Sequence, residues 1–302
     1  MLLQDKEGMI MDKALLVYNP FSGDRGIVQK LDYIIERFQQ ENILLQPYRI
    51  MEGCEKNISS LLTDGSYKFV ISSGGDGTLN FICNILMKNN LSMPMGIIPS
   101  GTCNDFASIL DIPTSVEECV NIILNGRTVD VDVGVVDEKT YFLSSCAGGV
   151  FVDVSFSTDG ELKKNLGALA YYLKALSEMA TMKPFRVTIE TEKEVFEDDI
   201  LLFCILNGKQ AGGFHNLMDA VYDDGLMDIV VIKDCRKIEL PAIFYKVISN
   251  ELQNDKNVVT IRTDRCAIKS SKEIILSIDG EKGPTLPVEV RFINKALKVF
   301  VA

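Results

Sequence analysis

The stretch VISSGGDGTLN, residues 70–80, places a glycine-rich loop with one carboxylate directly after an apolar segment. Residues 68–73 have the pattern of a buried β-strand. The loop is followed by the i, i+3, i+4, i+7 spacing of an amphipathic helix, with apolar side chains at Leu79, Ile82, Cys83 and Leu86. Glycine tolerates a positive φ and lets backbone amides approach a ligand, and a helix start adds a positive dipole end. The stretch therefore predicts a strand, a ligand-binding loop and a helix in succession.

The same alternation of strand and helix extends over the first part of the chain. Predicted strands cover residues 13–20, 43–50, 68–73 and 94–101, and predicted helices between them cover residues 27–40 and 57–64. Such alternation is typical of a parallel sheet with helices on both faces. We therefore expect an α/β fold with an N-terminal doubly wound parallel sheet.

From about Thr128 the pattern changes to short strands with alternating apolar residues, as in RTVDVDVGVV (127–136) and FRVTIETEKEVF (185–196). Two helical segments, residues 166–180 and 237–248, interrupt these strands. The pattern predicts an antiparallel, β-sandwich-like second domain. We expect domains at residues 1–130 and 131–302, and it is left open whether the last strand or strands return to the first domain.

Composition excludes several classes of protein. The net charge of −11 over 302 residues argues against a nucleic-acid partner, since such proteins use basic surfaces to neutralise phosphates. The eight cysteines form no CxxC pair, which predicts reduced thiols in a cytoplasmic protein. No apolar run approaches the roughly 18 residues of a membrane span. His215 is the only histidine and has no recognisable partner for zinc or catalysis, so it is interpreted as a loop residue.

Three loops follow the first, third and fourth predicted strands and are expected to converge, because ligands bind beyond the carboxyl ends of strands in open α/β sheets. They are NPFSGDRG (19–26), GGDGT (74–78) and PSGTCNDFA (99–107). In the third loop, Thr102 and Asp105 have the spacing of a capping box. Asp76 would repel a phosphate unless a divalent cation stands between them. Neither a P-loop motif nor a Rossmann fingerprint is present.

The motifs NPxSG, GGDGT and GTxNDFA, in this order and each after a predicted strand, resemble the diacylglycerol kinase catalytic domain, particularly that of the soluble bacterial lipid kinases. Sphingosine and ceramide kinases carry related motifs. The resemblance covers essentially the whole chain. It implies phosphorylation of a lipid hydroxyl with ATP and Mg²⁺, in a cleft between the two domains.

Site residues are carried over from this resemblance. The resemblance implies an ATP site at Asn19, Pro20, Phe21, Ser22, Gly23, Met51, Gly74, Gly75, Asp76, Gly77, Thr78, Leu79, Asn80, Phe81 and Thr102. Asp76 is expected to reach magnesium through water, and Glu281 of the sequence DGE to act as the catalytic base. At the position of Met51 the family usually has a small polar residue. In the first loop, the sequence SGDRG places its second glycine one residue further along than the family's NPxSGxG, and this departure affects Arg25 as a phosphate ligand.

The resemblance also implies a structural Mg²⁺ in the segment MDAVYDDGLMD (218–228), held by the Asp224 carboxylate and the carbonyls of Val221 and Leu226. From the residues alone this segment, like SIDGEKG (277–283), indicates an Asp-Gly hairpin turn. Met218 stands where the family usually has proline. Asp132 falls on an acidic position of the family, but an exposed strand residue is an equal alternative.

Several alternatives stay open at this point. Diacylglycerol, phosphatidylglycerol and a long-chain base are all candidate substrates. Both a monomer and a homodimer are open as the oligomeric state. Peripheral docking to the inner face of the membrane is expected, with helix 166–180 and Lys163, Lys164, Lys174 and Lys183 as one candidate surface; an ordinary packed helix is the alternative. A soluble-substrate kinase of the NAD kinase type and a regulatory protein without turnover are the competing functions.

Overall fold

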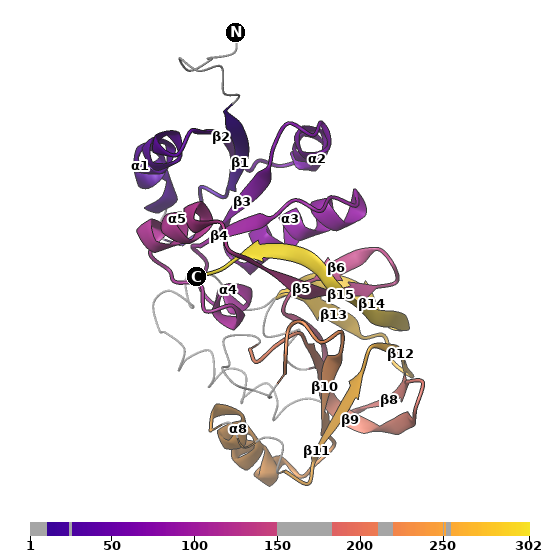
Figure 1. The fold of residues 1–302 in the computed structure, drawn as a ribbon. Coiled ribbons are helices and arrows are strands. Elements are labelled where there is room, and N and C mark those ends of the chain that lie inside the picture. Colours follow the sequence, from indigo (N-terminus) through magenta and orange to yellow (C-terminus); the bar gives the residue numbers. More distant parts are fainter. Residues whose placement is uncertain (1–10, 24–25, 150–182, 211–219, 250, 252–254) are drawn as a thin grey trace. The chain divides into compact units, whose positions relative to one another are not determined.

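The computed structural model describes residues 11–23, 26–149, 183–210, 220–249, 251 and 255–302 (Figure 1). The chain divides into two compact units. Unit 1 consists of Met1–Val131 and Ala296–Ala302, and unit 2 consists of Asp132–Lys295. Two long strands, β5 (Thr128–Val136) and β15 (Val288–Phe300), have residues in both units. The units are considered separately below.

Unit 1 contains a parallel sheet in the order β2-β1-β3-β4. Its strands are β1 (Asp12–Tyr18), β2 (Ile43–Arg49), β3 (Phe69–Gly74) and β4 (Met95–Pro99). Every residue of β3 and β4 is buried, which is expected of strands that are covered on both faces. Near its C-terminal end, β15 adds to this sheet through the parallel pair Val299 and Met95.

Helices cover both faces of this sheet (Figure 1). α1 (Gly26–Gln40) packs beside α5 (Val116–Asn125) on one face, and α2 (Glu55–Thr63) packs beside α3 (Asp76–Lys88) on the other. The short helix α4 (Asp105–Ile109) follows β4. Helix α5 was not among the helices predicted from the sequence. The Ser115 hydroxyl caps this helix by accepting from the Glu118 N–H, and Gly126 ends it with a φ of 74°.

Unit 2 is built from antiparallel strands. They are β6 (Thr140–Phe142), β7 (Ser145–Gly149), β8 (Phe185–Glu190), β9 (Val195–Leu206), β10 (Met227–Lys233), β11 (Val258–Thr263), β12 (Arg265–Ser270), β13 (Ile275–Ile278) and β14 (Glu281–Thr285). β9 pairs with β8 through its first half, with β7 through its second half, and with β10. It therefore belongs to two ladders, β7-β13-β14 and β8-β12-β15.

Side chains from both ladders form one hydrophobic core. Phe203 of β9, Ile268 of β12 and Leu276 of β13 are all fully buried in it. Phe142 of β6 packs edge-on against Phe292, with the ring centroids 5.7 Å apart. The predicted fold class is confirmed: a doubly wound parallel α/β sheet precedes a β-rich, sandwich-like unit.

Some details differ from the sequence-based expectation, and some lie outside the described residues. The segment 237–248 begins as a 3₁₀ turn, η1 (Lys237–Glu239), and continues as α8 (Leu240–Ile248). Helix 166–180 and its lysines 163, 164 and 174 lie outside the described residues, as do Arg25, His215 and Met218. Among the helices that are described, none combines the length and the apolar character that crossing a bilayer requires.

Candidate functional site

The three loops that follow β1, β3 and β4 are in direct contact at the carboxyl ends of these strands. Backbone hydrogen bonds continue past the strands: the Asn19 N–H donates to the Ser73 carbonyl, and the Ser100 N–H donates to the Gly74 carbonyl, both at 2.9 Å. Each loop therefore begins at a position fixed by its neighbour. The expected convergence of NPFSG, GGDGT and PSGTCNDFA is observed within unit 1.

Glycines make this close packing possible. A Cβ atom added to Gly101 would lie 2.5 Å from the Cα of Gly75, and one added to Gly23 would lie 2.3 Å from the carbonyl oxygen of Ser100. No side chain fits at either contact, because real Cβ atoms do not come this close to backbone atoms. The backbones of the three loops can therefore touch only because these positions are glycine.

The glycines of GGDGT do not serve the first of the two purposes expected, a positive φ. Gly74, Gly75 and Gly77 do not have positive φ angles, so conformational freedom does not explain them. A Cβ on Gly74 would lie 2.3 Å from the hydroxyl oxygen of Thr78, which folds back over the loop and is buried. The contact with Thr78 therefore favours glycine at Gly74, and a Cβ on Gly75 would lie only 3.1 Å from the Gly101 Cα.

The third loop is held by Asn104 and not by the capping box expected from Thr102. Asn104 occupies the N-cap position of α4 in the left-handed region, with a φ of 52°, and its side chain makes no cap hydrogen bond. Its amide instead brackets Gly101: Oδ1 accepts from the Gly101 N–H at 2.8 Å, and Nδ2 donates to the Gly101 carbonyl at 3.0 Å. The N-cap is Asn104 and not Thr102, which is exposed, so the capping-box prediction is wrong.

Asp76 connects the second loop to the third. It is the first residue of α3, and its Oδ1 accepts from the backbone N–H of Phe106 at 3.3 Å. Burial raises the pKa of the Asp76 carboxyl, whereas the backbone N–H groups of Phe106, Asp105 and Asn104 act in the opposite direction. The carboxylate thus supplies the acceptor at the start of α4 that Asn104 does not supply.

The first loop is more exposed. The Asn19 side chain accepts from the Phe21 N–H at 3.0 Å and closes a tight turn, while Pro20 is buried and Ser22 is half-buried. The Phe21 ring is 67% exposed, and the Arg49 guanidinium lies over it at 5.6 Å from the ring centroid. Arg49, which sequence reasoning missed, places a cation beside this loop.

The other proposed contacts vary in their access to solvent. Met51 follows β2 and is 57% exposed. Leu79 is fully buried in the core, so only its backbone is available to a ligand. Phe81 is half-buried, and the Asn84 amide donates to Asn80 through both the backbone and the side-chain oxygen of that residue, each at 2.9 Å.

Buried hydroxyls at the strand ends point to a polar ligand. The hydroxyl oxygens of Ser73 and Ser100 are buried and have no hydrogen-bond partner within the described part of the chain. Such groups are costly unless another molecule satisfies them. Together with the glycine contacts and the N-terminus of α3, they fit a ligand with phosphate-type oxygens. Both serines lie in stretches that the sequence pattern singled out, but only the structure shows that their hydroxyls are buried without a partner in its described part.

In unit 2, the sequence DGE forms the hairpin between β13 and β14. Asp279 and Gly280 both have positive φ, 47° and 86°, which confirms the Asp-Gly turn. The Asp279 carboxylate accepts three backbone N–H groups, from Leu143 at 2.8 Å, Ser144 at 2.8 Å and Ser145 at 3.0 Å. Glu281, the expected base, begins β14 with an exposed side chain on this anchored turn.

Asp132 is a buried anchor, so the alternative of an exposed strand residue is wrong. It is 0% exposed, and its two carboxylate oxygens accept from the Gly225 N–H at 2.6 Å and the Lys295 N–H at 2.7 Å. Burial raises the pKa of the Asp132 carboxyl, these N–H groups oppose that effect, and the charges of Asp224 and Asp223 add to it.

The expected metal position, Asp224, lies in a bend before β10 and not in a tight hairpin, because β9 and β10 are joined by residues 207–226. The Asp224 carboxylate pairs with the Arg262 guanidinium and accepts from the Leu226 N–H. The described residues contain no group of three His, Cys, Asp or Glu side chains arranged to hold a metal. Val221 is 40% exposed, so its carbonyl lies in an accessible segment.

The surroundings of Asp224 nevertheless fit a hard cation. Burial raises the pKa of the neighbouring Asp228 carboxyl, Arg262 lowers it, and the charge of Asp224 raises it further. One Asp228 oxygen, Oδ2, is buried without a hydrogen-bond partner among the described residues. Carboxylate and carbonyl oxygens are the ligands that a hard cation such as Mg²⁺ takes in proteins.

Comparison with known proteins shows the family to which this chain belongs. Residues 13–136 match the diacylglycerol kinase catalytic domain, and residues 145–301 match the YegS C-terminal NAD kinase beta sandwich-like domain. A protein named diacylglycerol kinase from Staphylococcus carnosus is 30% identical over 290 residues, covering 95% of this chain and 94% of that protein. The chain belongs to the diacylglycerol kinase family.

Other members of the diacylglycerol kinase family give the same result. A diacylglycerol kinase from Bacillus subtilis is 29% identical over 287 residues and 94% of each chain. The crystal structure of a diacylglycerol kinase from Bacillus anthracis superposes with a TM-score of 0.78 at 25% identity, covering 96% of this chain and 97% of the other. The protein is therefore an enzyme, a kinase of the diacylglycerol kinase type.

The raised pKa of Asp76 predicts a pH dependence of stability. Between the ordinary pKa of Asp and the raised value, the folded state binds more protons than the unfolded state, so this group's contribution to stability falls as pH rises. With EDTA present, Asp76→Asn should therefore melt at or above the wild-type temperature at pH 7, and this advantage should shrink towards pH 4. Thermal melts of both proteins across this range test it.

A different pattern would contradict this view of Asp76. If Asp76→Asn melts below wild type at pH 7 and equals it at pH 4, the folded protein favours the ionised carboxylate. Asp64→Asn is a suitable control because its carboxyl is exposed and its pKa is lowered by the side chain and backbone of Ser66. Its effect on the melting temperature should have the opposite pH trend.

Proposed function

We propose that the protein is an ATP- and Mg²⁺-dependent lipid kinase that phosphorylates a hydroxyl of diacylglycerol or a related membrane lipid. The observation that carries the proposal is the contact of three glycine-containing loops at the carboxyl ends of β1, β3 and β4. The names of the relatives support the choice of a lipid as the acceptor. Because the substrate resides in a bilayer, the enzyme would act at the membrane surface as a peripheral protein.

In unit 1, the loops would bind the nucleotide mainly through backbone groups. Asn19 to Gly23 and Gly74 to Phe81 offer turns and a helix N-terminus, which suit the phosphates of ATP. The hydroxyls of Ser73 and Ser100 provide two further donors at the strand ends. Positioning is the main task of the protein in phosphoryl transfer, since little covalent chemistry is required of its side chains.

Bound Mg²⁺ would neutralise charge on the phosphates during transfer. Asp76 can serve that ion through water while its Oδ1 keeps the contact with the Phe106 N–H. A nearby cation would favour the ionised carboxylate and so oppose the effect of burial on the pKa of Asp76. The same side chain would then fix the third loop and orient the ion.

In unit 2, Glu281 would act as the general base. The oxygen of the lipid hydroxyl forms a bond to the γ-phosphorus of ATP, the bond from that phosphorus to the ADP oxygen breaks, and the hydroxyl proton passes to the Glu281 carboxylate. The exposed side chain of Glu281 leaves its carboxylate accessible to a substrate hydroxyl. The three N–H groups that hold Asp279 keep the turn before Glu281 rigid.

A kinase assay tests the proposal. Wild type should transfer the γ-phosphate of labelled ATP to diacylglycerol in detergent micelles, and NAD should not be labelled. Glu281→Gln should lower kcat by about 10²–10⁴-fold, the usual contribution of a general base, with an unchanged melting temperature. The neighbouring exposed residue offers a control, Lys282→Gln, which should retain activity.

Either of two results would contradict the proposal. Labelled NAD without labelled lipid would indicate the NAD kinase type of activity, whose sandwich-like domain this chain resembles. Full activity in Glu281→Gln would remove Glu281 from the role of base. Mass spectrometry of a total membrane lipid extract after the reaction identifies which hydroxyl lipid is phosphorylated.

We further propose that Asp224 binds a structural Mg²⁺ with the carbonyls of Val221 and Leu226. Arg262 currently neutralises Asp224, so a bound ion would replace or share that contact. Added Mg²⁺ should therefore raise the melting temperature of wild type, as any ligand specific to the folded state does. The increase should be lost in Asp224→Asn and should be larger in Arg262→Gln, where the competing cation is absent.

Scanning fluorimetry over a Mg²⁺ titration, with NaCl at matched ionic strength, measures this effect. The proposal predicts opposite changes for the two substitutions. An equal Mg²⁺ response in wild type and Asp224→Asn would place the ion elsewhere. Asp223→Asn is a control that changes the same local charge without removing the proposed ligand.

A further inference from the structure

An apolar stripe lies exposed along η1 and α8 in unit 2. Ile238, Pro241, Ala242 and Tyr245 are all exposed, and they have the i, i+3, i+4, i+7 spacing of one helix face. Ile238 is 81% exposed and Tyr245 is 67% exposed, among the highest values for large apolar side chains in the described residues. An ordinary surface helix presents polar residues at such positions.

The other side of the same segment is buried. Leu240 and Ile243 are 2% and 1% exposed. The stripe is a second apolar face on a helix whose core face is already buried.

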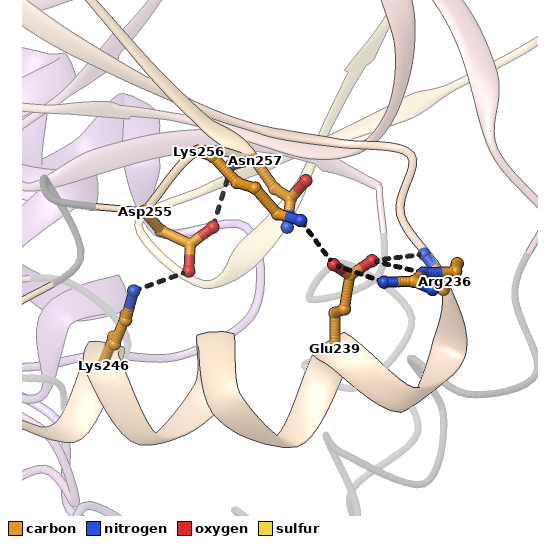
Figure 2. Close-up of polar contacts among 6 residues, drawn as sticks. All are labelled: Arg236, Glu239, Lys246, Asp255, Lys256 and Asn257. Carbon is orange, nitrogen blue, oxygen red and sulfur yellow. Dashed lines mark hydrogen bonds and ion pairs between the residues drawn. The ribbon is translucent and has the colours of Figure 1, made fainter.

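Ion pairs fix this helix and determine which charges reach the surface (Figure 2). Glu239 binds both Lys256 at 2.8 Å and Arg236 at 3.4 Å, and Asp255 binds Lys246 at 2.9 Å. The acidic side chains are the inner partners: Glu239 is 20% exposed and Asp255 is 9% exposed. By contrast, Arg236 and Lys256 are 79% and 73% exposed.

The acidic partners stay ionised and remain occupied by these cations. Lys256 and then Arg236 lower the pKa of Glu239 to about 2. Burial tends to raise the pKa of Asp255, but the Asn257 N–H and Lys246 outweigh it and lower the pKa. Neither acid therefore presents a free negative charge to an approaching surface.

Three further charged residues belong to this segment. Lys237, next to Ile238, is exposed and forms no ion pair with another described residue. The remaining acids of the segment, Asp234 and Glu251, lie before η1 and after α8 and not on the stripe. On a protein with a net charge of −11, this segment joins exposed apolar side chains to exposed cations.

We infer that the stripe Ile238–Pro241–Ala242–Tyr245, bordered by Arg236, Lys237 and Lys256, is the face that docks the enzyme onto an anionic lipid bilayer. Interfacial helices insert apolar side chains into the headgroup region of a membrane and carry cations beside those side chains. Charge complementarity selects an anionic membrane over a neutral one. The inference extends the proposed lipid kinase function, since it names the surface by which the enzyme reaches its substrate.

Sedimentation with vesicles tests the docking face. The full chain should bind vesicles of phosphatidylglycerol and phosphatidylcholine more tightly than vesicles of phosphatidylcholine alone. Ile238→Ser/Tyr245→Ser should weaken the binding by at least about tenfold, because two large side chains no longer leave water. Lys237→Gln should weaken binding to the anionic vesicles by about fivefold, and added NaCl should weaken the binding of wild type.

A matched control is available on the same unit. The hairpin between β8 and β9 also exposes an apolar and a basic side chain, Val195 and Lys193. Val195→Ser/Lys193→Gln removes the same kinds of groups from another part of unit 2 and should bind vesicles as wild type does. Equal loss in the control and in the stripe variant would overturn the inference.

A fluorescence experiment tests the contact directly, because the chain contains no tryptophan. Tyr245→Trp introduces a single indole on the stripe, and its emission should shift to the blue on anionic vesicles and be quenched by brominated lipid. Val195→Trp is the control and should show neither change. Unchanged Tyr245→Trp emission while the protein co-sediments with vesicles would show that another surface docks.

Three further outcomes are distinguishable. If wild type phosphorylates diacylglycerol in micelles but the stripe variant binds vesicles normally, the docking inference fails while the proposed function stands. If Ile238→Ser/Tyr245→Ser converts a dimer to a monomer in analytical ultracentrifugation without changing vesicle binding, the stripe is an interface between copies. Absence of lipid phosphorylation by wild type in micelles would instead contradict the proposed function.

Discussion

The backbones at Gly75 and Gly101 touch in the candidate site, and the rest of the site depends on this contact. A Cβ on Gly101 would lie 2.5 Å from the Gly75 Cα, so no other residue allows the loops after β3 and β4 to touch. This contact places the start of α3 beside the start of α4. Asp76 can then accept the Phe106 N–H, and Asn104 can bracket Gly101 on the other side. The packing of the loops, the acceptor at the start of α4 and the proposed nucleotide site therefore all depend on contact between the backbones at Gly75 and Gly101.

Acidic residues in this protein act repeatedly as acceptors for backbone amides. Asp279 holds residues 143–145, Asp132 holds Gly225 and Lys295, and Asp76 holds Phe106. Each carboxylate fixes a loop that carries a proposed functional residue, or lies next to one. A buried carboxylate with several N–H partners orders the backbone without a basic residue nearby. The high acidic content of the chain is thus partly structural and not only a surface property.

The sequence was sufficient for the sheet of unit 1, because its strands are continuous apolar runs and its helices are strongly periodic. It also identified the three loops, whose residues lie in the order and after the strands expected. It could not show why Gly74 and Gly75 are glycine, since their neighbours Thr78 and Gly101 are brought close only by folding. The Thr102 capping box was a local pattern that the contact with Asp76 overrides. Helix α5 was missed although Ser115, Glu118 and Gly126 carried its start and stop signals.

Isothermal titration with Mg²⁺ and ATP, comparing Gly101→Ala with Gly96→Ala, tests the central claim most directly. Both substitutions force a Cβ into occupied space in unit 1, since one on Gly96 would lie 2.7 Å from an Ile123 methyl group, but only Gly101 belongs to the loop contact. We expect both proteins to lose some thermal stability, as overpacked sites do. Nucleotide affinity should fall at least about tenfold in Gly101→Ala alone, the equivalent of one or two lost hydrogen bonds. Wild-type affinity in Gly101→Ala would contradict the claim that contact between these loops builds the nucleotide site.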